Sequence, residues 1–407
     1  MNTPKLSREI GFWLLLFYGL GNILGAGIYV LIGKVAGIAG YGSIFSFLIA
    51  CVVSVFTALS YTELVSRYPF SAGVAVYIKE GIGSKLLAVG SGIFIALAGL
   101  ISAAALSHGF VGYLSEFISL NESFTIVFII FIMIAIAING IKTSVTIATI
   151  FTIIEIFGLF LIIYLGFDNI IDPKVDYKEF IPTFNMDEIS IIFLGSFLAF
   201  YAFIGFEDMV TVSEEVNEPS KNFPRAIIWS LVVVTIIYSL IVVVSLQTLS
   251  IEQLSNSNAP LADVYESITN SDPVLISFIG LFAVINGALI QIIMASRIVY
   301  GLSNKGLIPK YFDEVSQKTK TPIKATILVG LITIVFALFF DIVTLAGFTS
   351  ILILIIFTFV NISLIRIKLD KEKFVQKKKG MINIPIWVPF CGVILNIILI
   401  LFSIVYG

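Results

Sequence analysis

Charged residues are scarce in this chain. Of its 407 residues, 12% are Lys, Arg, Asp or Glu, and 58% are hydrophobic. A soluble protein carries about twice that share of charged residues. The composition therefore excludes an ordinary water-soluble fold. The formal net charge of −2 says little by itself, and we expect no nucleic-acid partner.

Histidine and cysteine are also nearly absent, with one His and two Cys in the whole sequence. Cys51 and Cys391 both fall in apolar stretches, so we expect them to be small buried side chains without a disulfide. No metal-ligand cluster, phosphate-binding loop or catalytic triad can be recognised. The sequence therefore predicts neither a metal site nor a cofactor, and it argues against an enzyme.

Long apolar runs are what the sequence does contain. A helix needs about 20 apolar residues to cross the roughly 30 Å of hydrocarbon in a bilayer. Eleven stretches come close to that measure, at approximately 10–33, 42–62, 86–113, 124–140, 143–167, 189–212, 226–249, 273–300, 323–340, 342–366 and 384–406. The sequence therefore predicts an all-α integral membrane protein with about 11 transmembrane helices.

The basic residues of the loops favour one orientation of these spans. Lys and Arg concentrate in the cytoplasmic loops of membrane proteins. With the N-terminus in the cytoplasm, only Lys34, Lys174 and Lys178 of the 24 Lys and Arg residues fall on the opposite side. The segment 250–272 on that side contains acidic residues and no basic one. We expect a plasma-membrane protein with a cytoplasmic N-terminus and an extracytoplasmic C-terminus.

The first predicted span contains an unusual group of glycines. In the stretch GLGNILGAGIYVLIG, Gly19, Gly21, Gly25 and Gly27 follow one another closely, although a glycine costs about 1 kcal/mol in a helix interior. A dinucleotide-binding turn requires a preceding strand and a βαβ unit, which a membrane span does not supply. Close helix packing through a GxxxG spacing is a stronger alternative. The remaining interpretation is a helix that breaks.

A second interruption favours the break. The sixth span contains FYAFIGFED, in which Gly205 precedes Glu207 and Asp208. Spans one and six each begin a set of five helices, and interrupted helices at matching positions of two halves indicate a transporter's binding site. Because five is odd, the second set starts on the opposite side of the membrane. The N–H groups of a half-helix after Gly25 suit a carboxylate, and the carbonyls that end the preceding half-helices suit an ammonium.

We accordingly expect a 5+5 inverted repeat within a single transmembrane transport domain, residues 1–407. The first repeat would cover about 10–167 and the second about 189–367. An extra helix would follow at about 384–406.

Four segments resemble signatures of the amino acid–polyamine–organocation superfamily. GNILGAGIY resembles its first helix, and YTELVSRYPFSAGVAVYIKEGIG its loop between helices two and three. FYAFIGFEDMVTVSEEVNEPSKNFPRAI resembles its sixth helix and the following loop, and SRIVYGLSNKGLIPKYF the end of its eighth helix. The resemblance implies a LeuT-type fold, with helices 1 and 6 broken, that transports amino acids or related amines. Members usually have twelve helices, whereas eleven spans are predicted here.

The resemblance also implies a substrate site at the two breaks. Backbone N–H groups of the first break would hold the substrate carboxylate, carbonyls at both breaks would hold its ammonium, and aromatic rings of the sixth span would close on its side chain. For these rings, ordinary packing within the bundle is the alternative. The residues carried over are Gly25, Ala26 and Gly27 for the carboxylate, Ile23, Phe203 and Ile204 for the ammonium, Tyr201, Phe203 and Phe206 for the aromatic surface, and Gly205 for the second interruption.

Two acidic residues are candidates for coupling transport to an ion or a proton. Glu155 lies at the centre of the fifth span, where a carboxylate costs about 2.5–3.5 kcal/mol. Several family members carry a lysine there, so the glutamate is a departure; it could carry a coupling proton, help to hold a cation, or pair structurally with a neighbouring helix. Glu207 matches an acid that some relatives use near the substrate and proton path, with bonding to the unwound backbone as its alternative.

Together these features predict a secondary active transporter that moves an amino acid across the plasma membrane, either coupled to protons or as an exchanger. The expected partners are a small-molecule substrate and membrane lipid. An amine or polyamine carrier is one alternative, although it would need more carboxylates facing the cavity than Glu155 and Glu207 provide. A receptor of the same fold that binds an amino acid without transporting it is another.

Overall fold

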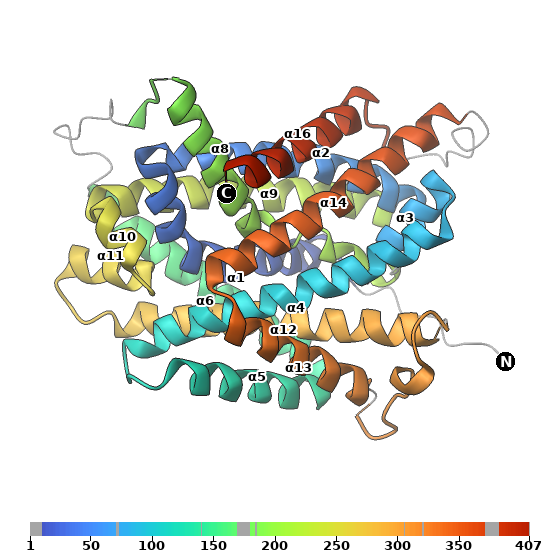
Figure 1. Cartoon of the computed structure of the whole chain (residues 1–407), viewed down its shortest axis with the longest axis horizontal. Helices are drawn as coiled ribbons and strands as arrows, with labels where there is room; N and C mark the ends of the chain where they lie inside the picture. The colour runs from blue at the N-terminus through green and yellow to red at the C-terminus, as the bar shows by residue number, and fades with distance from the viewer. Residues whose placement is uncertain are drawn as a thin grey trace.

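Long α-helices that run in roughly the same direction make up most of the chain (Figure 1). The computed structural model describes residues 10–70, 73–139, 141–168, 180–183, 185–304, 306–319, 321–370 and 382–406. In chain order the helices are α1 (Phe12–Ala39), η1 (Gly40–Gly42), α2 (Ser43–Arg67), α3 (Gly73–Ile82), α4 (Lys85–Ser115), α5 (Glu122–Ile138), α6 (Ile141–Leu165), α8 (Met186–Phe200), η3 (Tyr201–Phe203), η4 (Asp208–Glu215), α9 (Pro219–Thr248), α10 (Ile251–Asn256), α11 (Pro260–Thr269), α12 (Val274–Asn304), η5 (Lys310–Phe312), α13 (Ile323–Phe339), α14 (Ile342–Leu369) and α16 (Trp387–Tyr406).

These helices confirm the predicted all-α membrane architecture. Among the described residues, seven stretches are long and apolar enough to cross a membrane, one of which contains both α1 and α2, and three shorter apolar helices accompany them. Each of the eleven predicted spans coincides with one of these helices, or with α8 and its η3 and η4 continuation. The protein therefore crosses the membrane many times.

Helix ends are where the structure departs from the predicted spans. Helix α9 begins at Pro219 rather than near 226, because its polar first turns are not detected by a criterion based on apolar residues alone. The short helices α3, α10 and α11 were not predicted. Helix α10 nevertheless has a sequence signal, since Ser250 and Gln253 form a capping box at its start, a pairing typical of helix N-termini.

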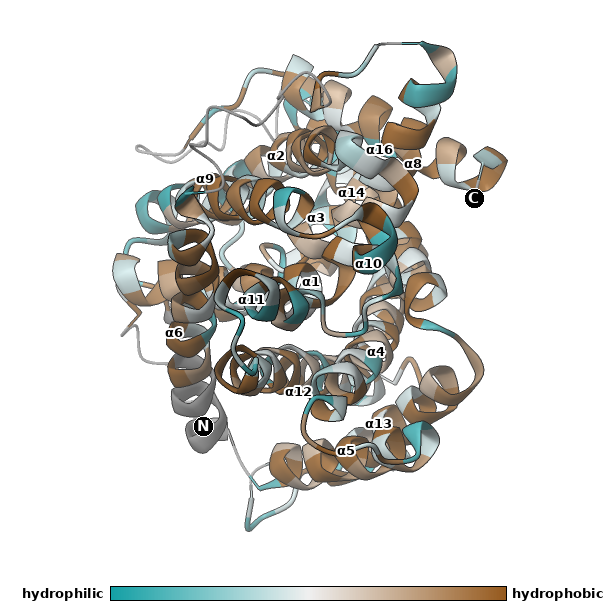
Figure 2. Cartoon of the chain, turned by 90° about the vertical axis from the view of Figure 1, so that its left-hand side faces the viewer, coloured by the Kyte–Doolittle hydropathy of each residue, from teal (hydrophilic) through white to brown (hydrophobic). Residues whose placement is uncertain are grey.

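Helix α1 occupies the centre of the bundle (Figure 2). It contacts α8 and α9, and it also contacts α6 and α12. Helices α2, α8 and α9 pack together, while α12, α4 and α13 pack together elsewhere, with α5 against α13. The interruption in α1 is thereby placed between these two groups of helices.

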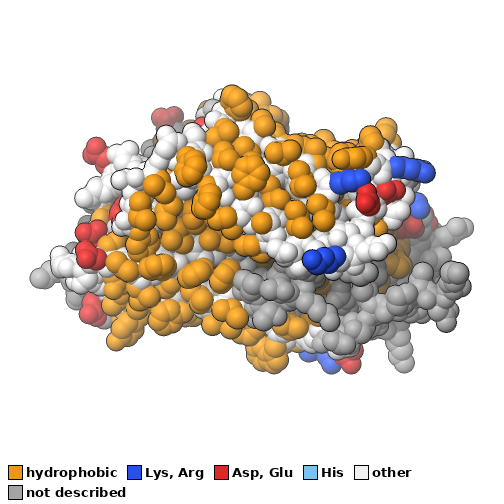
Figure 3. All heavy atoms as spheres, turned by 90° about the horizontal axis from the view of Figure 1, so that it is seen from below, with side chains coloured by type: hydrophobic (Ala, Val, Ile, Leu, Met, Phe, Trp, Pro, Cys, Tyr) orange, Lys and Arg blue, Asp and Glu red, His pale blue; other side chains and the backbone are white. Residues whose placement is uncertain are grey.

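The two ends of the bundle differ in charge. In Figure 3, hydrophobic side chains cover the middle of the visible face, Asp and Glu lie at one end, and Lys and Arg lie toward the other end together with some acidic residues. We call the end with Asp and Glu the acidic end, and it contains helices α10 and α11. The opposite end, which contains α3 and η5, is called the basic end (Figure 1). Lys174 and Lys178, two of the three basic residues expected on the acidic side, lie outside the described residues.

A buried charge cluster joins three elements at the basic end. Glu63 of α2 is 0% exposed, and its carboxylate pairs with Arg67 and with Lys368 of α14, both at 2.6 Å. The backbone N–H of Ile384, just before α16, donates to Oε2 of Glu63 at 2.8 Å. This carboxylate therefore links α2, α14 and the segment leading into α16.

Candidate functional site

Both predicted helix breaks are present. Helix α1 is interrupted at Gly25, whose φ of −12° and ψ of −155° are not helical. The second break follows η3, where Ile204 is extended, with φ −66° and ψ 139°, and Gly205 has φ +132°. The chain then continues as a 3₁₀-helix, η4.

Two glycines allow these breaks to face one another. A Cβ atom on Gly27 would lie 2.8 Å from Cα of Ala202, and one on Gly205 would lie 2.6 Å from the carbonyl oxygen of Asn22. The positive φ of Gly205 also lies in a region that side chains disfavour. Gly25 is different, because nothing lies within 4 Å of its Cβ position. The backbones of α1 and η3 therefore approach closely, with open space beside Gly25.

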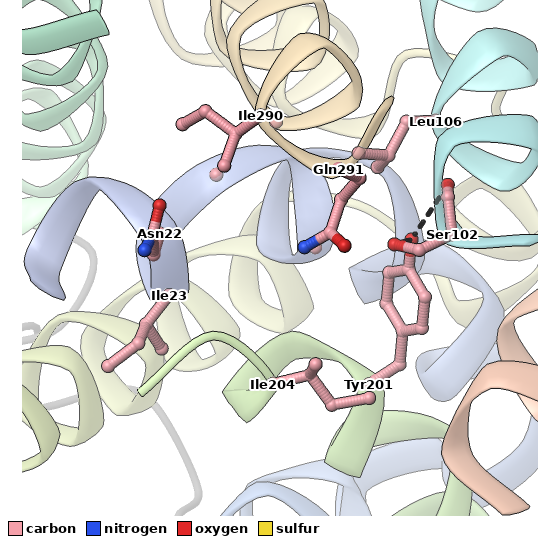
Figure 4. Close-up of a pocket in the computed structure, with 11 residues that line it drawn as sticks. Asn22, Ile23, Ser102, Leu106, Tyr201, Ile204, Ile290 and Gln291 are labelled. Atoms are coloured by element: carbon pink, nitrogen blue, oxygen red, sulfur yellow. Dashed lines mark hydrogen bonds between the residues drawn. The ribbon is translucent and has the colours of Figure 1, made fainter. Parts of the chain in front are cut away.

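That open space is part of a pocket, whose volume of about 420 Å³ includes open solvent. Its walls come from α1, from η3 and the turn that follows it, and from α4 and α12 (Figure 4). No charged side chain is among the described residues that line it. The lining residues are Asn22, Ile23, Gly25, Gly27, Ser102, Leu106, Tyr201, Ile204, Gly287, Ile290 and Gln291.

Five of the nine residues predicted to bind substrate line this pocket. Two others lie at the breaks without lining it: Gly205 contacts the backbone of Asn22, and Ala26 lies within α1, where the structure describes only its backbone. The five pocket residues are Ile23, Gly25, Gly27, Tyr201 and Ile204. The sequence thus indicated the α1 and η3 walls of the pocket.

The remaining two, Phe203 and Phe206, have their side chains outside the pocket. The ring of Phe203 packs against Tyr238, with centroids 5.3 Å apart, and the ring of Phe206 packs against Tyr61 and Phe357 at 5.7 and 5.1 Å. Both side chains are 0% exposed. Successive residues of a short 3₁₀ and extended segment point in different directions, so Tyr201 is the aromatic residue of the three that lines the pocket.

Tyr238 of α9 is an important residue at the breaks that the sequence did not indicate. Its hydroxyl donates to the carbonyl oxygens of Ile23, at 2.7 Å, and Ala202, at 3.0 Å. The carbonyl of Ile23 was predicted to bind a substrate ammonium. Because a carbonyl oxygen has two lone pairs, it can accept a second hydrogen bond beside that of Tyr238.

The walls contributed by α4 and α12 were also missed. The hydroxyls of Ser102 and Tyr201 lie 2.8 Å apart and share a hydrogen bond across the pocket (Figure 4). Gln291 Nε2 donates to Oδ2 of Asp208 at 3.3 Å. Neither α4 nor α12 has a strongly amphipathic sequence, so the pattern of apolar residues gave no signal for which side of each helix faces the pocket.

Glu155 is buried beside the pocket and does not line it. Its side chain is 0% exposed, and Oε1 accepts a hydrogen bond from Nδ2 of Asn286 on α12 at 3.0 Å. Oε2 is buried without a hydrogen-bond partner among the described residues. The backbone carbonyl of Glu155 accepts from the hydroxyl of Tyr29, 2.7 Å away. Glu155 therefore lies between α12 and the part of α1 that follows the break.

Glu207 has a partner within the second break. Its Oε2 accepts a hydrogen bond from the N–H of Gly205 at 2.9 Å, and the residue is 6% exposed. A hydrogen bond of this kind, from unwound backbone to the carboxylate, was the predicted alternative to a role of Glu207 in coupling. Glu207 therefore helps to satisfy the N–H of Gly205 within the interrupted helix.

A membrane-spanning bundle in which two broken helices face each other across a pocket is an arrangement typical of membrane transporters. Residues 10–407 match the protein family described as "Amino acid permease". The chain therefore belongs to this family, within the amino acid–polyamine–organocation superfamily, and its fold is the LeuT type. It is an amino acid transporter and not an enzyme.

Curated relatives agree with this assignment. The chain is 29% identical over 346 residues to the branched-chain amino acid permease BcaP of Bacillus subtilis, covering 79% of this chain and 72% of the relative. It is 28% identical over 386 residues to the mitochondrial cationic amino acid transporter 3 of Arabidopsis thaliana, covering 89% and 63%. It is 24% identical over 380 residues to cationic amino acid transporter 1 of the same plant, also covering 89% and 63%. The chain thus spans less than two thirds of the length of these two plant relatives.

Proposed function

We propose that this protein is a secondary active transporter that moves an amino acid across the plasma membrane, driven by a proton gradient or by exchange. The observation that carries the proposal is the pocket between the two helix breaks. Its lining is uncharged among the described residues, so the two charges of a zwitterionic amino acid would be matched by backbone groups. The same uncharged lining counts against a polyamine carrier, which would need carboxylates in the cavity.

Within this proposal the two ends of the amino acid bind at different breaks. The carboxylate binds the backbone N–H groups at Gly25, Ala26 and Gly27, where the second half of α1 begins. The ammonium binds carbonyl oxygens of Ile23, Phe203 and Ile204. Support comes from the open space beside Gly25 and from the closeness of Ala202 and Gly27, which brings the carbonyls of η3 near the start of that half-helix.

Replacing Gly25 with leucine tests this site. Because the Cβ of residue 25 points into open space at the pocket, a leucine side chain would extend into the volume proposed for the substrate. We expect at least about a 100-fold loss of amino acid affinity in Gly25→Leu, measured by binding to the purified protein and by uptake into proteoliposomes.

Gly90→Leu is a matched control. Gly90 lies in α4, does not line the pocket and also has no atom within 4 Å of its Cβ position. This variant should bind and transport like the wild type. Unchanged affinity in Gly25→Leu would contradict the proposed site, whereas binding without flux in the wild type would identify a receptor.

We further propose that Glu155 couples transport to protons. Its complete burial, its hydrogen bond to Asn286 and its contact with Tyr29 support this role. Asn286 precedes Gly287, which lines the pocket, and Tyr29 belongs to the half-helix that would hold the substrate carboxylate. A proton gained or lost at the carboxyl group of Glu155 would therefore act on the α12 wall through Asn286, while the backbone carbonyl of the same residue holds Tyr29 of the α1 wall. Glu207 is the second candidate.

A further inference from the structure

Gln291 separates the pocket from the carboxyl group of Asp208. The side chain of Gln291 extends from α12 into the pocket (Figure 4), and its Nε2 donates to Oδ2 of Asp208 at 3.3 Å. Asp208 begins η4, is 4% exposed and is not a lining residue. The amide of Gln291 therefore covers a buried carboxyl group that would otherwise face the substrate.

A glycine of the neighbouring helix lies beside this amide. A Cβ atom on Gly99 of α4 would lie 3.0 Å from Oε1 of Gln291. The amide thus fits between Asp208, which accepts its hydrogen bond, and a surface of α4 that is open only because residue 99 has no side chain. The absence of a side chain at residue 99 therefore leaves room for the amide of Gln291 in the position in which it bonds to Asp208.

The position of Gln291 in front of Asp208 affects which substrate side chains the pocket can bind. Leu106, Ile204 and Ile290 supply apolar surface, and the lining offers hydroxyl and amide groups but no carboxylate among its described residues. A cationic side chain that loses its water in such a pocket is unfavourable unless an anionic partner replaces the water. The carboxyl group of Asp208 could serve as that anionic partner, but the amide of Gln291 occupies the space between Asp208 and the pocket.

We propose that Gln291 is a specificity-determining residue which, by covering the carboxyl group of Asp208, makes the pocket select amino acids with uncharged side chains over those with cationic ones. The inference rests on the proposed function, since it concerns the substrate side chain at the same site. It predicts that removal of the amide converts Asp208 into a binding partner for a basic side chain.

The test compares uptake of leucine and lysine by protein reconstituted into liposomes. In the wild type, leucine should be taken up and lysine should be disfavoured. Gln291→Ala opens the space in front of Asp208, so the ratio of lysine to leucine uptake should rise at least about tenfold. The double variant Gln291→Ala/Asp208→Asn has the same space without the negative charge, and its ratio should return to the wild-type value.

Met294→Ala is the matched control on the same helix. Met294 also packs against Gly99, but it does not line the pocket, so its truncation should leave the lysine-to-leucine ratio unchanged. If Gln291→Ala is inactive in transport, the ratio of the two affinities is measured instead, from the stabilisation of the purified variant by each amino acid.

Three results would overturn the inference. They are a wild type that already prefers lysine, a Gln291→Ala protein with an unchanged ratio, and a double variant that keeps the raised ratio, which would assign the effect to space alone. Failure of the proposed function is recognised separately, because the wild type would then neither take up nor be stabilised by any amino acid.

Discussion

At the scale of single residues, three buried acids of the bundle have different hydrogen-bond partners. Glu207 accepts from the backbone of Gly205, Asp208 from the side chain of Gln291, and Glu155 from Asn286. Of these, Glu155 has one carboxyl oxygen buried without a partner among the described residues. A carboxyl group with a free, buried oxygen is well suited to hold a proton, since the neutral form avoids burying a charge.

Replacing Glu155 with glutamine tests its role in coupling. Glutamine has a similar shape and can still accept the hydrogen bond of Asn286, but it cannot release a proton. Glu155→Gln should therefore exchange substrate across the membrane, while a pH gradient should no longer drive accumulation in proteoliposomes. Glu252→Gln, at an exposed position of α10, is the control and should accumulate substrate as the wild type does.

Equal accumulation by Glu155→Gln and wild type would assign Glu155 a structural role and make Glu207 the next candidate. Substrate exchange should be measured in the same vesicles, because a variant that neither exchanges nor accumulates has lost transport itself. Such a result would also contradict a role confined to coupling.

The residue scale also shows what the sequence could predict about the site. Gly25, Gly27 and Gly205 were found because they interrupt apolar spans at matching positions of the two halves. Glu155 was found because an acidic residue at the centre of an apolar span is costly. Phe203 and Phe206 could not be assigned a direction, since this depends on the turn between η3 and η4. Tyr238, Ser102 and Gln291 come from helices whose sequences are not strongly amphipathic, so their orientation is set by packing partners distant in sequence.

At the scale of elements, the start of α14 shows how a helix end is fixed. The carboxylate of Asp341 accepts hydrogen bonds from the N–H groups of Val343 and Thr344, at 2.9 and 3.1 Å, and from the Thr344 hydroxyl at 2.7 Å. Partial burial by itself raises the pKa of Asp341, but these hydrogen bonds outweigh it and hold the pKa below the ordinary value of 3.8. The ionised form therefore stabilises the helix start.

Replacing Asp341 with alanine should lower the stability of the protein by about 1 kcal/mol at neutral pH, the usual effect of losing an N-cap. Because the pKa is lower in the folded protein than in the unfolded chain, the ionic part of this stabilisation is complete above the unfolded value. It is lost as the pH falls below about 3.8, through the folded value. The difference in Tm between wild type and Asp341→Ala, measured in detergent, should shrink over that range.

Asp341→Asn separates the two contributions of the cap. Asparagine keeps an oxygen that can accept the backbone hydrogen bonds, but it does not titrate. This variant should retain most of the wild-type Tm at neutral pH. A Tm difference between Asp341→Ala and wild type that grew on acidification would contradict this explanation.

At the scale of the whole molecule, the acidic and basic ends imply an orientation in the membrane. The end with α10 and α11 should face the exterior and the end with α3 and η5 the cytoplasm, since Lys and Arg concentrate on the cytoplasmic side. The sequence predicted this charge difference and the apolar spans well, because hydropathy and loop charge are local properties. It could not predict which helices would surround α1, because that depends on packing between apolar surfaces.

Single cysteines introduced at the two ends test the orientation. In a protein whose Cys51 and Cys391 are replaced by serine, the variants Asp272→Cys and Lys318→Cys place a thiol at exposed positions of the acidic and basic ends. A membrane-impermeant maleimide should label Asp272→Cys in intact cells, and it should label Lys318→Cys only after permeabilisation. The opposite pattern would reverse the proposed topology.

The buried cluster around Glu63 limits how such a molecule can change shape. Removing one partner of a buried ion pair costs about 3–5 kcal/mol, so a motion that pulled α14 away from α2 would be disfavoured. Because the N–H of Ile384 binds the same carboxylate, the start of α16 would be carried along with them. We therefore expect α2, α14 and the start of α16 to move as one rigid body. The backbone would then bend mainly at the unwound segments around Gly25 and Gly205. The chain would then pivot beside its proposed substrate site, so that a bound molecule would sit at the hinge itself.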